Sequence, residues 1–137
     1  MTDPLTNNPP TDNQLTFIGK IQTPYQRIEE CPNNIQTDGP LCTIELLEEY
    51  KDGLLGLKQG QKILILYWFE NVNRNALQQS RKTGGEALGT FALRSPHRPN
   101  PIGAAELIIE KIENNKITVK GLDCLNQTNL IDIKPAI

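Results

Sequence analysis

The sequence contains little of several residue types on which many functional sites depend. Its 137 residues include three cysteines, one histidine and only 5% aromatic residues, and the formal net charge is −2 at pH 7. A nearly balanced charge gives no general attraction for nucleic acid or for an anionic membrane, so any contact with nucleic acid has to be local. With one histidine and dispersed cysteines, the sequence predicts no metal site.

Targeting and membrane signals are also missing from the sequence. No apolar run is long enough to span a bilayer, and no signal peptide is recognisable. The cysteines, Cys31, Cys42 and Cys124, are odd in number and form no Cys-x-x-Cys pair. We therefore expect a protein of the reducing cytoplasm with no membrane partner.

Two segments of the chain are expected to be irregular. Residues 71–85 include two adjacent glycines but lack the spacing of a Walker loop or of a dinucleotide fingerprint, and we interpret them as a mobile excursion. Residues 24–40 form a long irregular segment, and a loop of that length in a small domain is usually functional or disordered.

Short apolar or alternating runs, separated by turn residues, make up the rest of the chain. The length of the chain suits one domain. Residues 1–13 are polar and contain prolines, so we assign them to a flexible arm and residues 14–137 to the domain. The expected strands are 15–21, 41–46, 62–69, 105–112, 116–120 and 130–134, with one short helix within 47–57. The apolar run 62–69 should be the central strand of the core. This pattern predicts an all-β fold with one or two short helices, either a single-domain β-barrel or a strongly curved sheet.

The densest chemistry of the chain lies in the proline-rich loop, Phe91–Gly103. It contains three prolines, two arginines and the only histidine. Each proline fixes its own φ and pushes the preceding residue towards extended geometry, which makes the loop stiff. A stiff loop loses little conformational entropy when a ligand binds, so this stretch predicts a preorganised site for a small polar ligand. The alternative is a connection between strands that displays solvated charges.

Three further segments extend the same argument: Tyr67-Trp68-Phe69, Gly121-Leu122-Asp123 and Leu130–Pro135. With the proline-rich loop they supply aromatic surface, carboxylates and arginines. An adenine ring stacks on aromatic side chains, a ribose exchanges hydrogen bonds with polar groups, and an amino-acid carboxylate pairs with arginine. The set therefore suits an adenosine-bearing cofactor, although core packing would also explain the aromatic residues, and turn capping or surface pairing the carboxylates.

The proline-rich loop resembles the signature of the TsaA-like family of S-adenosylmethionine-dependent methyltransferases, whose best-known members N6-methylate threonylcarbamoyladenosine in tRNA. The resemblance runs from about Phe17 to Pro135. It includes, in order, Ile18–Tyr25, Cys31-Pro32, Asp38-Gly39-Pro40, Leu57, Tyr67-Trp68-Phe69, Gly121-Leu122-Asp123 and Asp132–Pro135.

This resemblance implies a single-domain β-barrel that works as a homodimer, binds S-adenosylmethionine without a Rossmann domain and methylates tRNA. The residues implied to line the cofactor pocket or its rim are Phe69, Phe91, Arg94, Ser95, Pro96, Arg98, Asn100, Ile102 and Lys134. If the acceptor is an adenine N6 amine, a proton leaves as the bond forms, and a carboxylate, His97 or water takes it. We favour Asp123 or Asp132 as the catalytic base.

The chain departs from the family pattern at several places that bear on the acceptor. Leu93 stands where threonine is common, Ala104-Ala105 follows the motif, Asn126–Asn129 replaces an Asp-Gly-Thr-Pro turn, and Ala136 replaces a tyrosine. Three functions therefore stay open: methylation of tRNA, methylation of a small metabolite, and binding of the cofactor without transfer. For tRNA, we expect a basic face that includes Arg81, Lys82, Arg94 and Arg98.

Overall fold

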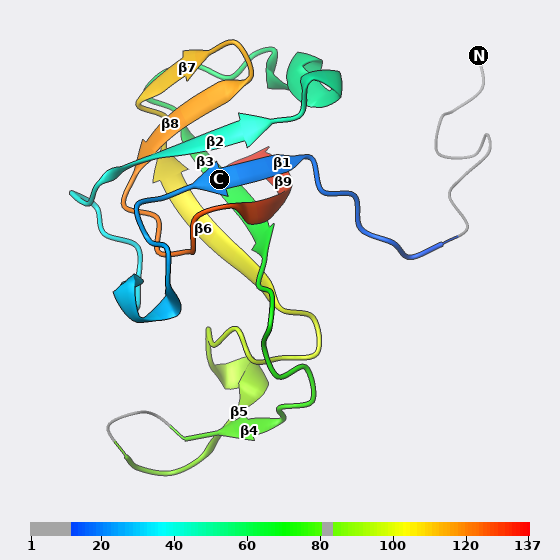
Figure 1. Ribbon diagram of the computed structural model, residues 1–137, viewed down its shortest axis with the longest axis vertical. Helices are drawn as coiled ribbons and strands as arrows, with labels where there is room; N and C mark the ends of the chain where they lie inside the picture. The colour runs from blue at the N-terminus through cyan, green and yellow to red at the C-terminus, as the bar shows by residue number, and fades with distance from the viewer. Residues whose placement is uncertain (1–11, 81–83) are drawn as a thin grey trace.

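The computed structural model describes residues 12–80 and 84–137, and within them most of the regular structure is β-strand. Seven strands form one antiparallel sheet in the order β6-β3-β9-β1-β2-β8-β7, and β4 and β5 form a small second sheet (Figure 1). The strands are β1 (Gly19–Gln22), β2 (Leu41–Leu46), β3 (Lys62–Trp68), β4 (Gln78–Gln79), β5 (Leu88–Gly89), β6 (Ile102–Ile108), β7 (Lys111–Glu113), β8 (Lys116–Lys120) and β9 (Thr128–Pro135). The short 3-10 helices in this part of the chain are η1 (Ile28–Glu30), η2 (Glu48–Leu54) and η3 (Thr90–Ala92). The predicted all-β class is confirmed, and the helix predicted within 47–57 is η2.

Strand β3 shows how alternation in the sequence builds the core. Ile63, Ile65 and Tyr67 face inward and are at most 2% exposed, whereas the residues between them are half-buried. β3 pairs with β6 on one side and with β9 on the other, so it is enclosed as predicted, although it lies second from the edge of the sheet. The aliphatic side chains with no exposed surface are Ile21, Ile44, Ile63, Ile65, Ile109, Ile117, Val119, Leu122 and Leu130. Burial of each of them contributes about 2 kcal/mol to folding.

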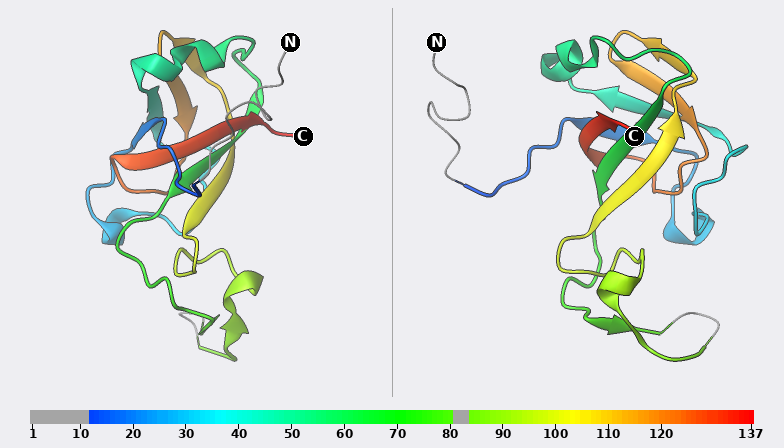
Figure 2. Two further views of the ribbon diagram at one scale, coloured as in Figure 1. Left: turned by 90° about the vertical axis from the view of Figure 1, so that its right-hand side faces the viewer. Right: turned by 180° about the vertical axis from the view of Figure 1, so that it is seen from behind.

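The larger sheet is strongly curved but open (Figure 2). Of the two predicted alternatives, the described residues therefore form the curved sheet and not a closed β-barrel. β6 is one edge of the sheet and β7 is the other, and in residues 12–80 and 84–137 no backbone pairing joins them. β7 has three residues and pairs only with β8, which leaves little backbone for a ladder with the seven-residue β6. The strand predicted at 105–112 is divided between these two strands, which are separated by Ile109, a buried residue, and Glu110.

The segment between β3 and β6 projects from the end of the larger sheet as a separate lobe (Figures 1 and 2). It contains β4, β5, η3 and the proline-rich loop. Part of the predicted excursion at 71–85 is thus regular strand, and its residues 81–83 lie outside the described residues. Phe69 N donates to Pro101 O at 2.9 Å, which joins the end of β3 to the start of β6. The lobe therefore holds the proline-rich loop next to the aromatic end of β3.

Most of the predicted amino-terminal arm, residues 1–11, also lies outside the described residues, so the arm stays a prediction. No helix in the described part of the chain is long and apolar enough to cross a membrane.

Candidate functional site

A cavity of about 670 Å³ lies at the end of the larger sheet where β3 finishes. We call it the β3-end cavity. Residues of four segments line it, 28–33, 68–72, 94–96 and 123–128. Its volume falls within the range of small-molecule sites, about 300–1,000 Å³. It brings together four of the predicted site residues, Phe69, Arg94, Pro96 and Asp123.

The proline-rich loop is braced from inside by Arg98. This half-buried guanidinium donates to the carbonyl oxygens of Ser95 at 2.8 Å, Leu93 at 3.0 Å and Thr90 at 3.4 Å. The N–H groups of Arg98 therefore bind the loop backbone, and these hydrogen bonds stabilise the loop in addition to its prolines.

The first part of the lobe fixes the other side of this loop. Asn73 N donates to Nδ1 of His97 at 3.1 Å, and Nε2 of Gln79 donates to the His97 carbonyl at 2.8 Å. Nε of Arg74 donates to Pro99 O at 2.8 Å. His97 thus accepts hydrogen bonds that hold the lobe together, and it does not line the β3-end cavity.

Arg94 is the cationic residue of the cavity wall. Its side chain is exposed, and its Nη2 donates to Ala104 O at 2.8 Å, at the start of β6. One nitrogen is thereby anchored, while the rest of the guanidinium fork can pair with an anionic group of a ligand.

Asp123 is the half-buried carboxylate of the same cavity. The Tyr67 hydroxyl donates to its Oδ1 at 3.2 Å. Burial raises the pKa of Asp123, although the hydrogen bond from Tyr67 and the charge of Arg94 pull the pKa in the opposite direction. A carboxylate with a raised pKa is a stronger proton acceptor than an ordinary aspartate.

Cys31 also lines the cavity. Burial raises the pKa of its thiol, and the negative charge of Asp123 adds to the effect. These surroundings favour the neutral thiol, so they do not activate Cys31 as a nucleophile.

Two glycines allow the close packing behind the site. A Cβ on Gly103 would lie 2.5 Å from Cε2 of Tyr67 and 2.8 Å from Cε2 of Phe69. Gly121 has a φ of +79° and lies against the backbone of Gln36, whose amide donates to Gly121 O at 2.8 Å. This contact fixes the segment 24–40 against the residues that lead to Asp123.

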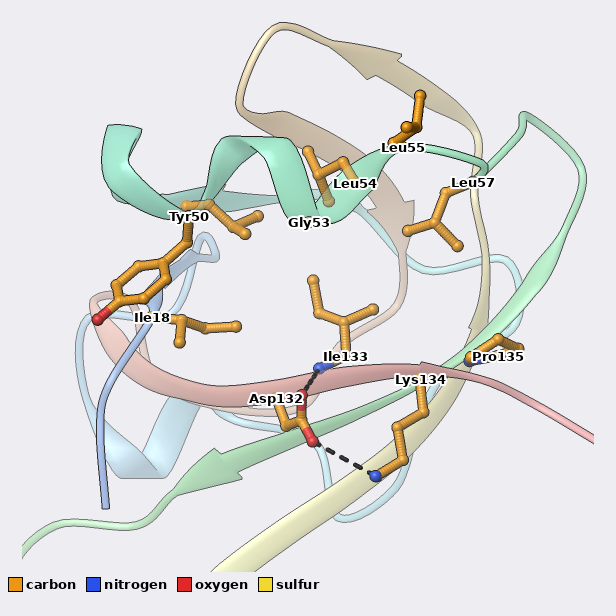
Figure 3. Close-up of a pocket in the computed structure, with 11 residues that line it drawn as sticks. Ile18, Tyr50, Gly53, Leu54, Leu55, Leu57, Asp132, Ile133, Lys134 and Pro135 are labelled. Carbon is orange, nitrogen blue, oxygen red and sulfur yellow. Dashed lines mark hydrogen bonds and ion pairs between the residues drawn. The ribbon is translucent and has the colours of Figure 1, made fainter. Parts of the chain in front are cut away.

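Two predicted residues lie on a different pocket. Asp132 and Lys134 form an ion pair at 3.5 Å beside a pocket of about 390 Å³ between η2 and β9 (Figure 3). Thr128 lines the β3-end cavity, and at about 3.3 Å per strand residue Asp132 is about 13 Å further along β9. Within one chain, Asp132 and Lys134 therefore lie outside the cavity that Asp123 and Arg94 line.

The remaining predicted residues do not line the β3-end cavity. Phe91 is 79% exposed on the lobe, and Ile102 is 36% exposed on the edge strand β6. Asn100 is exposed, and the Ser95 hydroxyl accepts from His97 N at 3.2 Å. The cofactor roles of these residues stay predictions.

Sequence reasoning missed several residues of the cavity wall: Ile28, Glu29, Asn33, Val72, Leu125 and Gln127. Ile28, Glu29 and Asn33 belong to the segment 24–40, whose unusual length was the sequence signal of a functional loop. The sequence predicts Tyr67 only as part of an aromatic strand end, and no local pattern pairs it with Asp123. The described residues contain no group of three or more His, Cys, Asp or Glu side chains able to hold a metal ion.

Comparisons with known proteins agree with the resemblance of the proline-rich loop. The chain is 42% identical to the "Probable S-adenosyl-L-methionine-binding protein VirR" of Rhizobium radiobacter, over 90% of this chain and 71% of that protein. It is 38% identical to the rat "tRNA (adenine(37)-N6)-methyltransferase", over 61% of this chain but 20% of the rat protein. Its fold matches a crystal structure of TrmO from Pseudomonas aeruginosa with a TM-score of 0.73 and 29% identity, over 92% of this chain and 56% of the crystallised one. This chain thus spans little more than half of that TrmO.

Residues 20–137 match the family described as "tRNA-methyltransferase O N-terminal domain". Because this match covers most of the chain, the protein belongs to the TrmO family, which is the TsaA-like family that its sequence resembles.

Proposed function

We propose that this protein binds S-adenosylmethionine in the β3-end cavity and transfers its methyl group to an adenine N6 of tRNA, that of threonylcarbamoyladenosine in the anticodon loop. The observation that carries the proposal is the cavity itself, which joins Arg94, Phe69 and Asp123 in a member of the TrmO family.

The residues of the cavity fit each part of this cofactor. The free side of the Arg94 guanidinium suits an amino-acid carboxylate. The rings of Trp68 and Phe69 offer apolar surface for an adenine, and Asn126 and Thr128 offer polar groups for a ribose.

The reaction mainly requires that the acceptor amine and the methyl group are aligned. When bound, S-adenosylmethionine supplies a methyl group on a sulfonium, which is a good leaving group. The braced proline-rich loop and the aromatic wall hold the two reactants in line and exclude water. Asp123 accepts the proton that the amine loses, and the raised pKa of this carboxylate suits that task.

A tRNA substrate is supported by the family description and by the name of the rat relative. Of the four basic residues predicted to face RNA, Arg94 is exposed at the cavity and Arg98 is used inside the loop, while Arg81 and Lys82 lie outside the described residues. Arg74, exposed beside the same loop with its guanidinium 5.2 Å from the Trp68 ring centre, adds a further cation. A homodimer would place two such faces on one RNA, and tRNA modification would place the protein in the cytoplasm.

Cofactor binding without transfer is the second candidate, because the Rhizobium relative is named only as a binding protein. Isothermal titration calorimetry with S-adenosylmethionine tests binding, and transfer of labelled methyl groups into bulk tRNA or into a small-molecule extract tests the reaction. We expect the protein to bind the cofactor and to transfer label into tRNA. The variant Asp123→Asn should abolish this transfer, whereas Lys58→Ala, just before the start of β3 and remote from the cavity, should leave it unchanged. Binding with no label in either acceptor would favour the second candidate, label only in the extract would indicate a metabolite methyltransferase, and absence of binding at millimolar cofactor would overturn all three.

A further inference from the structure

The buried hydroxyl of Tyr67 has a single polar side-chain partner among the described residues, and that partner is Asp123. Tyr67 is 2% exposed, and burial raises the pKa of its hydroxyl well above the ordinary value, so the hydroxyl stays protonated and acts as a donor at any working pH. The two residues lie 56 positions apart in the sequence, so their contact depends on how the strands assemble.

The strands around Tyr67 depart from regular pairing at this residue. In the ladder between β3 and β9, Leu66 pairs with Asp132 but Tyr67 pairs with Leu130, which leaves Ile131 as an extra residue in β9. A bulge of this kind bends the strand and changes the direction of neighbouring side chains, and bulges are common beside active sites.

The ring of Tyr67 is then held on two sides. On β6, the residue opposite Tyr67 is Gly103, the only residue type that leaves space for the ring at this distance. On β3 itself, Phe69 packs edge-on against Tyr67, with ring centres 5.4 Å apart and planes at 65°. The bulge, the glycine and the second ring surround the ring of Tyr67, whose hydroxyl donates to Asp123.

We propose that Tyr67 is a positioning residue for the reaction, whose hydroxyl orients the Asp123 carboxylate and sets the pH at which that carboxylate can accept a proton. This inference rests on the proposed role of Asp123 as the base. A hydrogen bond from a neutral donor stabilises the charged carboxylate, so it opposes the effect of burial on Asp123.

The other titratable groups near Asp123 are one arginine, two cysteines, one tyrosine and two exposed glutamates. Arg94, from the proline-rich loop, also stabilises the charged form. Cys31, Tyr25 and Cys124, from the neighbouring segments, are neutral over the working range because burial raises the pKa of each. Glu29 and Glu70 are exposed at the rim of the cavity. Tyr67 is therefore the one neutral side chain that donates a hydrogen bond to this carboxylate in the described structure.

The test is Tyr67→Phe, which keeps the ring and removes the hydroxyl, with Tyr50→Phe on the other pocket as the matched control. We expect the pKa of the Asp123 carboxyl, followed by its ¹³C resonance and assigned through Asp123→Asn, to rise by about one unit in Tyr67→Phe and to stay unchanged in Tyr50→Phe. The acid limb of the rate profile for methyl transfer should move to higher pH by the same amount, with cofactor affinity within about twofold of wild type.

The two readouts separate the inference from the proposed function. If the wild-type protein binds the cofactor but transfers no methyl group, the carboxyl titration still reports whether Tyr67 controls Asp123. An unchanged carboxyl titration in Tyr67→Phe would overturn the inference. A shifted titration with an unmoved rate profile would overturn the catalytic part of it, because Asp123 would then not be the base.

Discussion

Arg94 and Arg98 lie four residues apart in one loop, but the structure gives them different contacts. Arg98 is half-buried and donates to three carbonyl oxygens of its own loop, whereas Arg94 is exposed, lines the β3-end cavity and has one anchoring bond to Ala104. The sequence alone assigns both to the cofactor because both belong to the same motif. Burial and hydrogen-bond partners distinguish a residue that lines the cavity from one that supports the loop.

Substitution of each arginine should therefore affect a different property. Arg94→Ala should weaken S-adenosylmethionine binding by about 10- to 100-fold, as expected when a charge-assisted hydrogen bond is lost, with the melting temperature nearly unchanged. Arg98→Ala should lower the free energy of unfolding by about 1–3 kcal/mol, and Arg98→Lys should not restore it, because an ammonium group cannot reproduce the planar fork. Calorimetry and thermal unfolding measure the two effects. A large loss of stability in Arg94→Ala, with cofactor affinity intact, would show that the roles are assigned the wrong way round.

Strands β3 and β6 pair along the wall behind the site, and their close packing depends on Gly103. Because a Cβ there would lie 2.5 Å from the Tyr67 ring, Gly103→Ala has to displace Tyr67 or Phe69. We expect a loss of about 1–3 kcal/mol in the free energy of unfolding, together with reduced cofactor binding. The matched control is Gly53→Ala in η2, where the added Cβ meets nothing within 4 Å and the change should stay within about 0.5 kcal/mol. Chemical denaturation compares the two variants, and equal stabilities would mean that the rings move aside at no cost.

Local patterns predicted β2, β3 and β8 well, because alternation of buried and exposed side chains is a local property. They were less accurate for β6, which begins three residues before the expected strand 105–112, and for β1, which begins four residues after the expected start at residue 15. The expected strands 41–46 and 116–120 coincide with β2 and β8, and 62–69 differs from β3 by one residue. The two-residue strands β4 and β5 are too short to produce such a pattern. The order of strands in the sheet could not be predicted from local patterns either, because β9 lies between β3 and β1 through contacts between distant parts of the chain.

At the scale of the whole molecule, the sequence predicted a site where strand ends and motifs meet, and the structure divides that site into two. Arg94, Phe69 and Asp123 share one cavity, whereas Asp132 and Lys134 lie beside the other pocket because β9 carries them away from it. The hydrogen bond from Tyr67 to Asp123 also escaped sequence reasoning, because it depends on a bulge between strands that are distant in the sequence.

The balanced charge of the whole chain limits how it can hold RNA. With a formal net charge of −2, binding has to rely on a few local cations, and Arg74 and Arg94 are exposed beside the cavity. If two or three phosphates are neutralised, log affinity should fall with log salt at a slope of about −2, which is about a 15-fold loss between 50 and 200 mM salt. Fluorescence anisotropy with labelled tRNA measures this slope. Arg74→Ala should reduce it by about 1, and Lys58→Ala, remote from the cavity, should leave it unchanged. Affinity that does not respond to salt would contradict phosphate contacts at this face and would favour a small-molecule acceptor.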